Sequence, residues 1–220
     1  MFSPQVEWTP PEEFKDLSKY DEIAIDLETK DPELKTMGSG SVTGKGKIVG
    51  IALAVKDWSA YYPIAHEGGG NMDEEKVLNY FRTILSLPSR KIFHNAMYDV
   101  CFIRAAGLKI AGDIVDTMIA GSLVDENRFR YDLGSLGRDY LGKGKNEAVL
   151  GETAKEWGID AKSEMYKLPA MYVGEYAERD AELTLELWEE MKKEIYIQDI
   201  EDIFKLETDL FPCLVDMRFL

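Results

Sequence analysis

Apolar residues in the first third of the chain follow the pattern of β-strands. Residues 22–29, EIAIDLET, alternate apolar and other side chains with a period of two. The apolar runs 48–55 and 59–65 come next and are separated by a turn around Asp57. These three segments predict a meander of hydrogen-bonded strands. The intervening stretch 37–47 is rich in glycine, and we expect a flexible surface loop there.

From residue 73 onward the periodicity becomes mainly helical. Apolar residues at helical spacing predict helices over 73–85 and 95–107, whereas 91–93 and 113–117 read as short strands. Most of the chain after residue 117 is expected to be helical, including a long helix from Val173 to about Ile195. Strands first, then strands alternating with helices, predict an α/β fold with a mixed five-stranded sheet flanked by helices.

Both ends of the chain carry helix signals. Thr9 and Glu12, with two prolines between them, resemble a capping box and predict a short helix through about Tyr20. Residues 200–220 read as a helix interrupted or kinked near Pro212. This last pattern stops without a cap or a polar tail, so we expect the chain to be the N-terminal piece of a longer protein.

Composition excludes several classes of protein. The 220 residues hold 26 Lys and Arg against 41 Asp and Glu, a net charge of −15. A protein that grips duplex DNA by neutralising many phosphates has the opposite balance. The acids either make the surface soluble or include some that hold metal ions. Two distant cysteines and two distant histidines, His66 and His94, predict neither a disulfide framework nor a zinc site.

No segment marks the chain for a membrane or for export. The longest apolar runs fall well short of the ~20 residues of a membrane span, and the first residues lack the features of a signal peptide. We therefore expect no membrane partner and a cytoplasmic location, which is the host cytoplasm if the source is viral.

Two acids on the first strand are the first candidates for chemistry. Asp26 and Glu28 lie two residues apart, so they project from the same face with Cα atoms about 6.6 Å apart. Ala24 shares that face, and its small side chain leaves space above it. The opposite face carries Ile23, Ile25 and Leu27. An acidic pair at a strand end is also typical of a solvated rim, so it needs partners to indicate a site.

Two helices supply possible partners. Asp99 follows Asn95 by four residues and shares its helix face, although a helix cap and an acid favoured by the macrodipole explain this pair equally well. Tyr176 and Asp180 are likewise one turn apart, which in most proteins is an ordinary surface pair.

Four acids from three separate elements have the composition of a two-metal phosphodiesterase site. Two divalent ions about 3.5–4 Å apart activate water and stabilise the leaving oxygen. Mg²⁺ prefers carboxylate oxygens, keeps several waters and binds partly through the substrate phosphate. The ions would also supply the positive charge that this acidic chain lacks.

The segments IAIDLET, FHNAMYD and YAERD, in this order, resemble the three motifs of the DEDD superfamily of 3′→5′ exonucleases. A tyrosine lies four residues before the last aspartate, and in this the sequence resembles the Tyr branch of the superfamily. The stretches 61–66, 130–142 and 205–220 resemble the proofreading domain of family A DNA polymerases. The resemblance implies a ribonuclease-H-like fold, with residues 1–197 as the exonuclease domain and 198–220 as a helical lead into an absent, covalently linked polymerase domain.

The resemblance also implies roles for the acids. Asp26, Glu28 and Asp180 would ligate the first of two Mg²⁺ ions (Mn²⁺ being possible), Asp26 would bridge to the second, and Asp99 would help through water. Tyr176 would orient the attacking water, because its reference pKa near 10 makes it a poor base at neutral pH.

Five further residues would contact the substrate, the 3′ end of single-stranded DNA. Leu27 and Thr29 would line the terminal nucleotide by side chain or backbone, Asn95 and Tyr98 would border the cleft, and Arg130 would lie near a phosphate. The implied function is proofreading with release of nucleoside 5′-monophosphates.

Two alternatives remain open, and two segments depart from the family. The first alternative is an RNA-trimming exonuclease, because the Tyr branch includes such enzymes, but the polymerase-like last helix argues against it. The second alternative is a catalytically silent scaffold, but the presence of all four acids and Tyr176 argues against it. The stretch between Glu28 and Ile48 is long and rich in glycine, and 143–170 aligns poorly, so contacts to the penultimate base stay unassigned.

Overall fold

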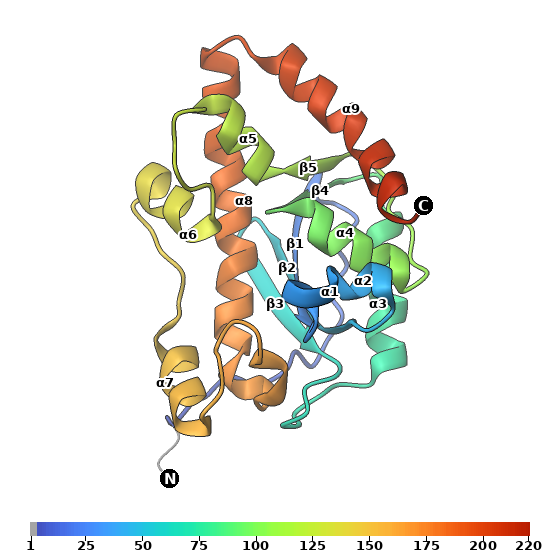
Figure 1. Ribbon diagram of the computed structural model, residues 1–220, viewed down its shortest axis with the longest axis vertical. Coiled ribbons are helices and arrows are strands. Elements are labelled where there is room, and N and C mark those ends of the chain that lie inside the picture. Colours follow the sequence, from blue (N-terminus) through green and yellow to red (C-terminus); the bar gives the residue numbers. More distant parts are fainter. Residues whose placement is uncertain (1–3) are drawn as a thin grey trace.

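The computed structural model describes residues 4–220 and is built around one mixed sheet (Figure 1). The strand order is β3-β2-β1-β4-β5. The strands are β1 (Glu22–Lys30), β2 (Lys47–Val55), β3 (Trp58–Pro63), β4 (Arg90–Phe93) and β5 (Ile114–Asp116). β2 runs antiparallel to β1 and β3, whereas β4 is parallel to β1 and β5 is parallel to β4. The predicted five-stranded mixed α/β sheet is confirmed.

Helices surround this sheet, and most of them match the predicted segments. In chain order they are α1 (Leu34–Met37), α2 (Gly40–Thr43), α3 (Glu74–Ser86), α4 (Ala96–Ala105), α5 (Thr117–Val124), α6 (Leu133–Leu136), the π-helical η1 (Gly137–Leu141), α7 (Ala148–Trp157), the 3₁₀ turns η2 (Met165–Lys167) and η3 (Ala170–Tyr172), α8 (Gly174–Ile197) and α9 (Glu201–Arg218). Among the helices of residues 4–220, none combines the length and the hydropathy needed to cross a bilayer.

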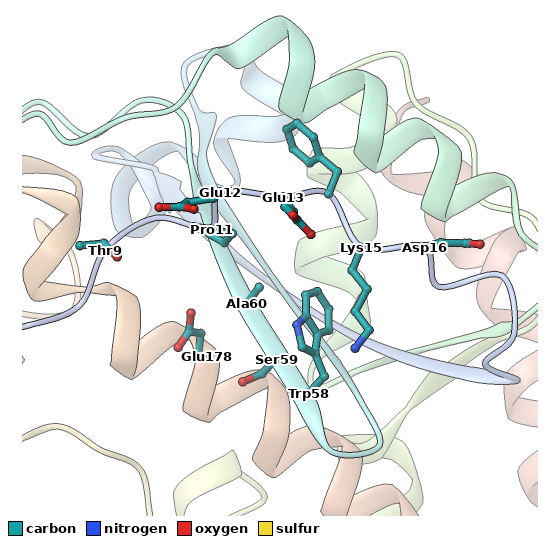
Figure 2. A pocket seen from close by; sticks show the side chains of 11 residues that line it. Thr9, Pro11, Glu12, Glu13, Lys15, Asp16, Trp58, Ser59, Ala60 and Glu178 are labelled. Atoms are coloured by element: carbon teal, nitrogen blue, oxygen red, sulfur yellow. The ribbon is translucent and has the colours of Figure 1, made fainter.

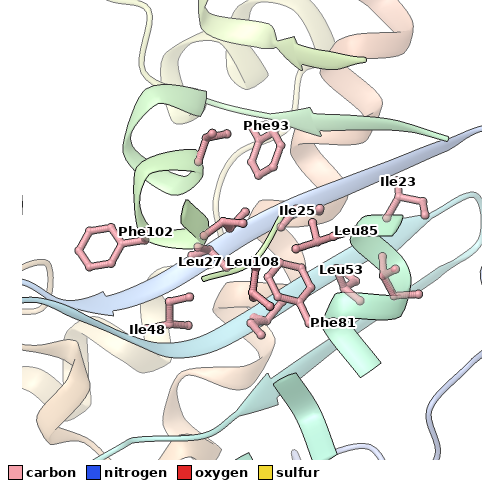
Figure 3. Packing of buried hydrophobic residues seen from close by; sticks show 14 of the residues in the cluster. Ile23, Ile25, Leu27, Ile48, Leu53, Phe81, Leu85, Phe93, Phe102 and Leu108 are labelled. Carbon is pink, nitrogen blue, oxygen red and sulfur yellow. The ribbon is translucent and has the colours of Figure 1, made fainter. Parts of the chain in front are cut away.

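The two faces of the sheet belong to two different cores. Ile23, Ile25 and Leu27 point to the face covered by α3 and α4, where they meet large side chains such as Phe81 and Phe102 (Figure 3). The other face of the same strands is covered by α8 and carries small residues, Ala24 on β1 and Ala52 and Ala54 on β2. Small side chains let the axis of α8 approach the sheet closely, which brings the residues of α8 to β1.

The helix predicted for residues 9–20 is wrong. This segment is irregular and runs past β3, where it lines a cavity of about 750 Å³ with Trp58, Ala60 and Glu178 (Figure 2). Proline disfavours helical backbone in the residue before it, and here two residues in a row, Thr9 and Pro10, precede a proline. Tertiary contacts anchor the segment instead, because Trp8 Nε1 donates to Glu178 Oε1 over 3.0 Å.

The glycine-rich stretch is more ordered than the expected loop. It contains α2, and the backbone N–H of Gly40 donates to both carboxylate oxygens of Asp31, at 3.0 and 3.1 Å. A Cβ on Gly40 would lie 2.5 Å from the backbone nitrogen of Gly46, so this close chain approach requires glycine.

The last helix passes through its proline. α9 continues from Glu201 to Arg218 with Pro212 inside it, so the predicted interruption does not occur. Phe211 and Val215 hold the helix in place, because both are buried in the core on the α3 and α4 side.

Candidate active site

Strand β1 presents the first two acids beneath α8. Asp26 pairs with Ala52 of β2, which in turn pairs with Tyr61 of β3, so these three residues form a row across the sheet. Glu28 pairs with Gly50 of β2. Asp26 and Glu28 are both partly exposed, and the space over Gly50 is filled by the side chain of Tyr61.

A register shift follows directly after these acids. Glu28 pairs with Gly50 but Thr29 pairs with Ile48, so Val49 is the extra residue of a bulge in β2. The carbonyl of Val49 then accepts from the backbone N–H groups of Ile64 and Ala65. Bulges increase the local twist and redirect side chains, and they are frequent beside active sites.

The third acid reaches β1 from α4. Parallel pairing of β1 with β4 covers only Glu22 to Ala24, because β4 ends at Phe93. Beyond that point the edge of β1 needs other partners, and the N–H of Leu27 donates to Asp99 Oδ1 over 2.9 Å. Asp99 is thereby fixed beside the strand that carries Asp26 and Glu28.

A further acid, Asp116, holds α4 in this position. Its carboxylate accepts from the backbone N–H groups of Asn95 and Ala96, at 2.9 and 2.8 Å, and also from Met118 at 2.9 Å. One side chain thus caps the first turns of both α4 and α5. Asn95 is at the N-cap position in the left-handed region, with φ 62°, and its own side chain makes no cap bond.

Helix α8 supplies the fourth acid and the tyrosine. Asp180 is buried and Tyr176 lies one turn before it. Lys145, on the loop between η1 and α7, contacts both of them. Its Nζ donates to Asp180 Oδ2 over 2.5 Å and to Tyr176 Oη over 3.2 Å, and it lies 5.2 Å from the centre of the Tyr176 ring.

Burial raises the pKa of every acid of the site, and repulsion by neighbouring acids of the site adds to this for Asp26, Glu28 and Asp99. Burial, together with the nearby charge of Asp180, raises the pKa of Asp26 to about 7. Burial and the charges of Asp26 and Asp180 raise the pKa of Glu28 well above its ordinary value, and burial and Asp26 do the same for Asp99. Burial also raises the pKa of Asp180, although the Lys145 ammonium opposes this. Such effects require that the carboxylates of three elements lie close together.

Burial and the charges of the acids also shift the pKa values of Tyr176 and Lys145. Burial and the charge of Asp180 raise the pKa of Tyr176, so its hydroxyl stays protonated at neutral pH. Burial by itself would lower the pKa of Lys145, but attraction to Asp180, Asp26 and Glu28 raises it above the ordinary value. The site therefore contains an ammonium that is charged at neutral pH.

The substrate-binding candidates occupy different places. Thr29 Oγ1 and Tyr98 Oη share a hydrogen bond of 2.7 Å, and Tyr98 Oη also donates to Asp31 over 3.1 Å. Tyr98 and Asn95 line a cavity of about 540 Å³ beside α1 and α2. These contacts join the end of β1 to the start of α4.

Leu27 and Arg130 lie apart from that cavity. The side chain of Leu27 is buried in the core opposite the acids, so only its backbone faces the site. Arg130 is exposed on the loop between α5 and α6, where its carbonyl accepts from Arg128 Nε.

The acids carry hard oxygen donors, which divalent cations such as Mg²⁺ prefer, but they are not spaced as the ligands of one ion. Within residues 4–220, no group of three or more His, Cys, Asp or Glu side chains has the arrangement of a metal site. However, Asp180 Oδ1 is buried without a hydrogen-bond partner, and Asp180 Oδ2 bonds the Lys145 ammonium. A buried carboxylate oxygen without a partner, in a set of hard oxygen donors, is compatible in chemistry with a divalent ion such as Mg²⁺.

Sequence reasoning missed two groups of this site. Lys145 lies in the poorly aligned stretch 143–170, and its only signal is the basic, glycine-rich run 142–145, GKGK. The second group is the pair Tyr61 and His66, in which Tyr61 Oη donates to His66 Nε2 over 2.6 Å while His66 Nδ1 donates to the carbonyl of Leu168 over 3.0 Å. The stretch 61–66 that contains both residues is part of the family resemblance, but its pattern does not show that they bond to each other.

Comparisons with known proteins agree with this geometry. A family model described as 3′–5′ exonuclease matches residues 7–196. The DNA-directed DNA polymerase of Pseudomonas phage M6 is 36% identical over 201 residues, which are 89% of this chain and 30% of the phage protein. The chain therefore spans about a third or less of the length of this relative.

Two solved structures share the fold. Brucella melitensis NrnC with bound Mg²⁺ has a TM-score of 0.64 at 16% identity, covering 92% of this chain and 87% of that one. Escherichia coli RNase D, an exoribonuclease involved in structured RNA processing, has a TM-score of 0.62 at 15% identity, covering 92% and 46%. At these identities the likeness establishes the ribonuclease-H-like fold alone. From the match to the family model and the three acidic segments that converge in the structure, the chain belongs to the 3′–5′ exonuclease family that forms the proofreading domain of family A DNA polymerases.

Proposed function

We propose that this chain is a two-metal-ion exonuclease that shortens single-stranded DNA from its 3′ end and releases nucleoside 5′-monophosphates. The observation that carries the proposal is the meeting of Asp26, Glu28, Asp99 and Asp180 from β1, α4 and α8, with Asp180 Oδ1 buried and unpartnered. The family of the chain and its phage polymerase relative support the same reaction.

The residues divide the work between holding ions and placing water. Asp26, Glu28 and Asp180 would hold the first divalent ion, and Asp26 would also hold the second, with Asp99 helping through water. Mg²⁺ or Mn²⁺, when bound, lowers the pKa of water and stabilises charge on the leaving oxygen. The hydroxyl of Tyr176 stays protonated, so it orients the attacking water rather than removing its proton.

Asp99 has a second task in this scheme. Its Oδ1 accepts from the N–H of Leu27, so Oδ2 is the oxygen not used by this bond. The carboxylate is therefore held in one orientation before any ion binds, and a fixed ligand loses less conformational entropy on binding. NrnC, a relative in fold, is known with bound Mg²⁺.

The substrate contacts follow from the same placement. Thr29 and Tyr98, joined by their hydroxyls, and Asn95 border the terminal nucleotide, Leu27 contributes backbone, and Arg130 approaches a phosphate. A net charge of −15 favours weak binding of a frayed single strand over tight binding of duplex. A steep salt dependence of DNA binding by this chain would contradict that inference.

The chain would act as part of a larger polymerase. Residues 1–197 form the exonuclease domain, and 198–220 lead into a covalently linked polymerase domain. In support, the phage relative is a DNA polymerase about three times as long as the matched region. The exposed apolar residues Leu206, Leu210 and Met217 of α9 offer a face for that domain. The phage relative also supports action in the cytoplasm of a host cell.

RNA is the second candidate substrate. The fold of this chain is shared with RNase D, an exoribonuclease. The alignment with a DNA polymerase at 36% identity favours DNA, because the fold likeness to RNase D comes with only 15% identity.

One assay separates these functions. DNA and RNA oligonucleotides of one sequence, labelled at the 5′ end, are incubated with the chain in Mg²⁺ or in EDTA. Asp26→Ala removes a ligand, and Asp21→Ala, an exposed acid just before β1, is the matched control. We expect a Mg²⁺-dependent ladder that shortens DNA from its 3′ end, absent with Asp26→Ala and unchanged with Asp21→Ala.

Other outcomes each have a defined meaning. Faster shortening of RNA would assign the chain to the RNA-trimming branch. Absence of any ladder with a melting temperature that does not respond to Mg²⁺ would indicate a silent scaffold. Equal losses of activity and of melting temperature in Asp26→Ala would indicate a structural role for Asp26.

A further inference from the structure

Lys145 is a cation placed inside the carboxylate site by the chain itself. Its Nζ lies 2.5 Å from Asp180 Oδ2 and 3.2 Å from Tyr176 Oη. The Lys145 side chain is 22% exposed and that of Asp180 is 4% exposed, so the pair is mostly shielded from water. An ion pair so placed is screened far less by salt than a surface pair.

The ammonium and a divalent ion compete for the same oxygen. Mg²⁺ binds carboxylate oxygen at about 2.0–2.1 Å, closer than the ammonium, and the two cations repel each other. Asp180 Oδ2 has lone pairs for both, but an ion on this oxygen would lie within a few ångströms of the ammonium, and their repulsion favours withdrawal of Lys145. Since Oδ1 of the same carboxylate is buried, an ion that uses both oxygens requires Lys145 to move away.

The loop that carries Lys145 is built to allow that movement. Gly142 has φ 64°, and a Cβ at Gly144 would meet nothing within 4 Å, so glycines lie in open space before the lysine. Besides the contacts of Lys145 itself, a long hydrogen bond of 3.4 Å from Arg179 Nε to the carbonyl of Gly144 and the exposed pair of Lys143 with Glu186 tie this part of the loop to α8. The partly exposed stem of Lys145 has a route to water.

We propose that Lys145 is a displaceable internal counter-ion of Asp180, which holds Asp180 and Tyr176 in place before metal binds and withdraws when a divalent ion takes its position. This inference rests on the two-metal function proposed above. It makes Lys145 a positioning residue that sets the metal concentration at which the site fills.

The test is direct binding of Mn²⁺ to the full chain, measured by electron paramagnetic resonance of free Mn²⁺ at pH 8. Lys145→Met removes the ammonium and keeps the length of the side chain. Lys143→Met is the matched control, because Lys143 lies two residues away on the same loop but pairs with Glu186 on the surface. A hydrogen bond between charged groups corresponds to about tenfold or more in affinity, so we expect Lys145→Met to bind Mn²⁺ about tenfold more tightly and Lys143→Met to match wild type.

Melting temperatures in EDTA and in Mn²⁺ guard against a folding defect. We expect Lys145→Met to melt below wild type in EDTA, because Asp180 loses its counter-ion, and to gain more than wild type on adding Mn²⁺. If Lys145→Met unfolds, Lys145→Gln, which keeps a polar end, replaces it in the same measurements.

The outcomes distinguish this inference from the proposed function. Wild type that binds Mn²⁺ while Lys145→Met binds it equally or more weakly overturns the counter-ion role alone. Binding by Lys145→Met but not by wild type supports it strongly. Absence of binding in both overturns the two-metal function and this inference with it.

Discussion

Asp26→Asn should stabilise the metal-free protein while it abolishes catalysis. Asp26 lies beneath α8 among other acids, and burial together with the charge of Asp180 raises its pKa to about 7 from a reference of 3.8. A carboxyl with a raised pKa binds more protons in the folded state than in the unfolded state. Stability therefore falls as the pH rises from about 4 through 7, and the penalty is complete above pH 7.

The pKa gives the size of this penalty. At 1.36 kcal/mol per pKa unit, ionising Asp26 at pH 8 costs the fold roughly 4 kcal/mol, and at pH 5 the cost drops to about 2 kcal/mol. Asparagine has the same shape and no charge, but its amide must itself stay hydrogen-bonded, which offsets part of the gain. We expect a net gain of about 2–4 kcal/mol at pH 8, or roughly 5–12 °C in melting temperature for a chain of this size.

Thermal denaturation in EDTA at pH 5 and pH 8, and again at pH 8 with Mg²⁺, measures each part of this prediction. In EDTA the variant should gain most at pH 8 and much less at pH 5. With Mg²⁺ wild type should recover stability, whereas Asp26→Asn should respond weakly because a ligand is missing. The matched control, Asp21→Asn, should change none of the three values, since Asp21 is exposed.

One result would refute the reasoning. If Asp26→Asn melts below wild type in EDTA at pH 8, the carboxylate is held by favourable contacts rather than by repulsion among acids. A gain that is equal at pH 5 and pH 8 would likewise show that the charge of Asp26 is not its source.

Three further changes test other parts of the structure. Tyr176→Phe removes the hydroxyl that we propose to orient water, so turnover should fall about 10²-fold in steady-state assays with little change in KM. An unchanged turnover would remove Tyr176 from the proposed mechanism. Lys91→Met removes a fully buried ammonium that donates to the carbonyls of Leu87, Ser89 and Ala111. Urea denaturation should therefore show that the free energy of unfolding falls by about 3 kcal/mol. The control Lys109→Met, at an exposed lysine, should leave it unchanged. Gly50→Ala places a Cβ 2.0 Å from Tyr61 Oη, so it should lower the free energy of unfolding by about 2 kcal/mol or more and break the hydrogen bond from Tyr61 to His66. The control Gly151→Ala, in open space on α7, should cost no stability. Equal stability of the two variants would mean that the ring of Tyr61 moves freely.

Residue patterns predicted the elements that depend on local alternation. The two-residue period of 22–29 determines that Asp26 and Glu28 share one face and that Ile23 and Leu27 share the other, and the structure has this arrangement. The helical spacing of Tyr176 and Asp180 likewise places them together on α8. Such inferences need only the geometry of a strand or a helix.

Features that depend on distant contacts could not be read in this way. The capping-box pattern at Thr9 and Glu12 is opposed by two consecutive prolines and by the contact of Trp8 with Glu178, 170 residues away. Lys145 joins the site only because its loop packs on α8. Asp99 could be placed on a helix face, but its bond to the N–H of Leu27 follows from β4 ending before β1 does.

Because α8 must pack on β1 to assemble the proposed site, the site can form only late in the synthesis of the chain. Contacts between the two elements join residues far apart in the chain: Glu22 accepts from Trp188 Nε1 over 3.0 Å, and the carboxylates of residues 26 and 180 share one site. A ribosome must therefore release nearly 200 residues before α8 can cover its face of the sheet. Until then that face, with Ala24, Ala52 and Ala54, stays open to other chains, and pairing over such separations is slow. The nascent chain consequently lacks the proposed site until α8 is made, and chains that terminate before α8 are expected to aggregate or to be degraded.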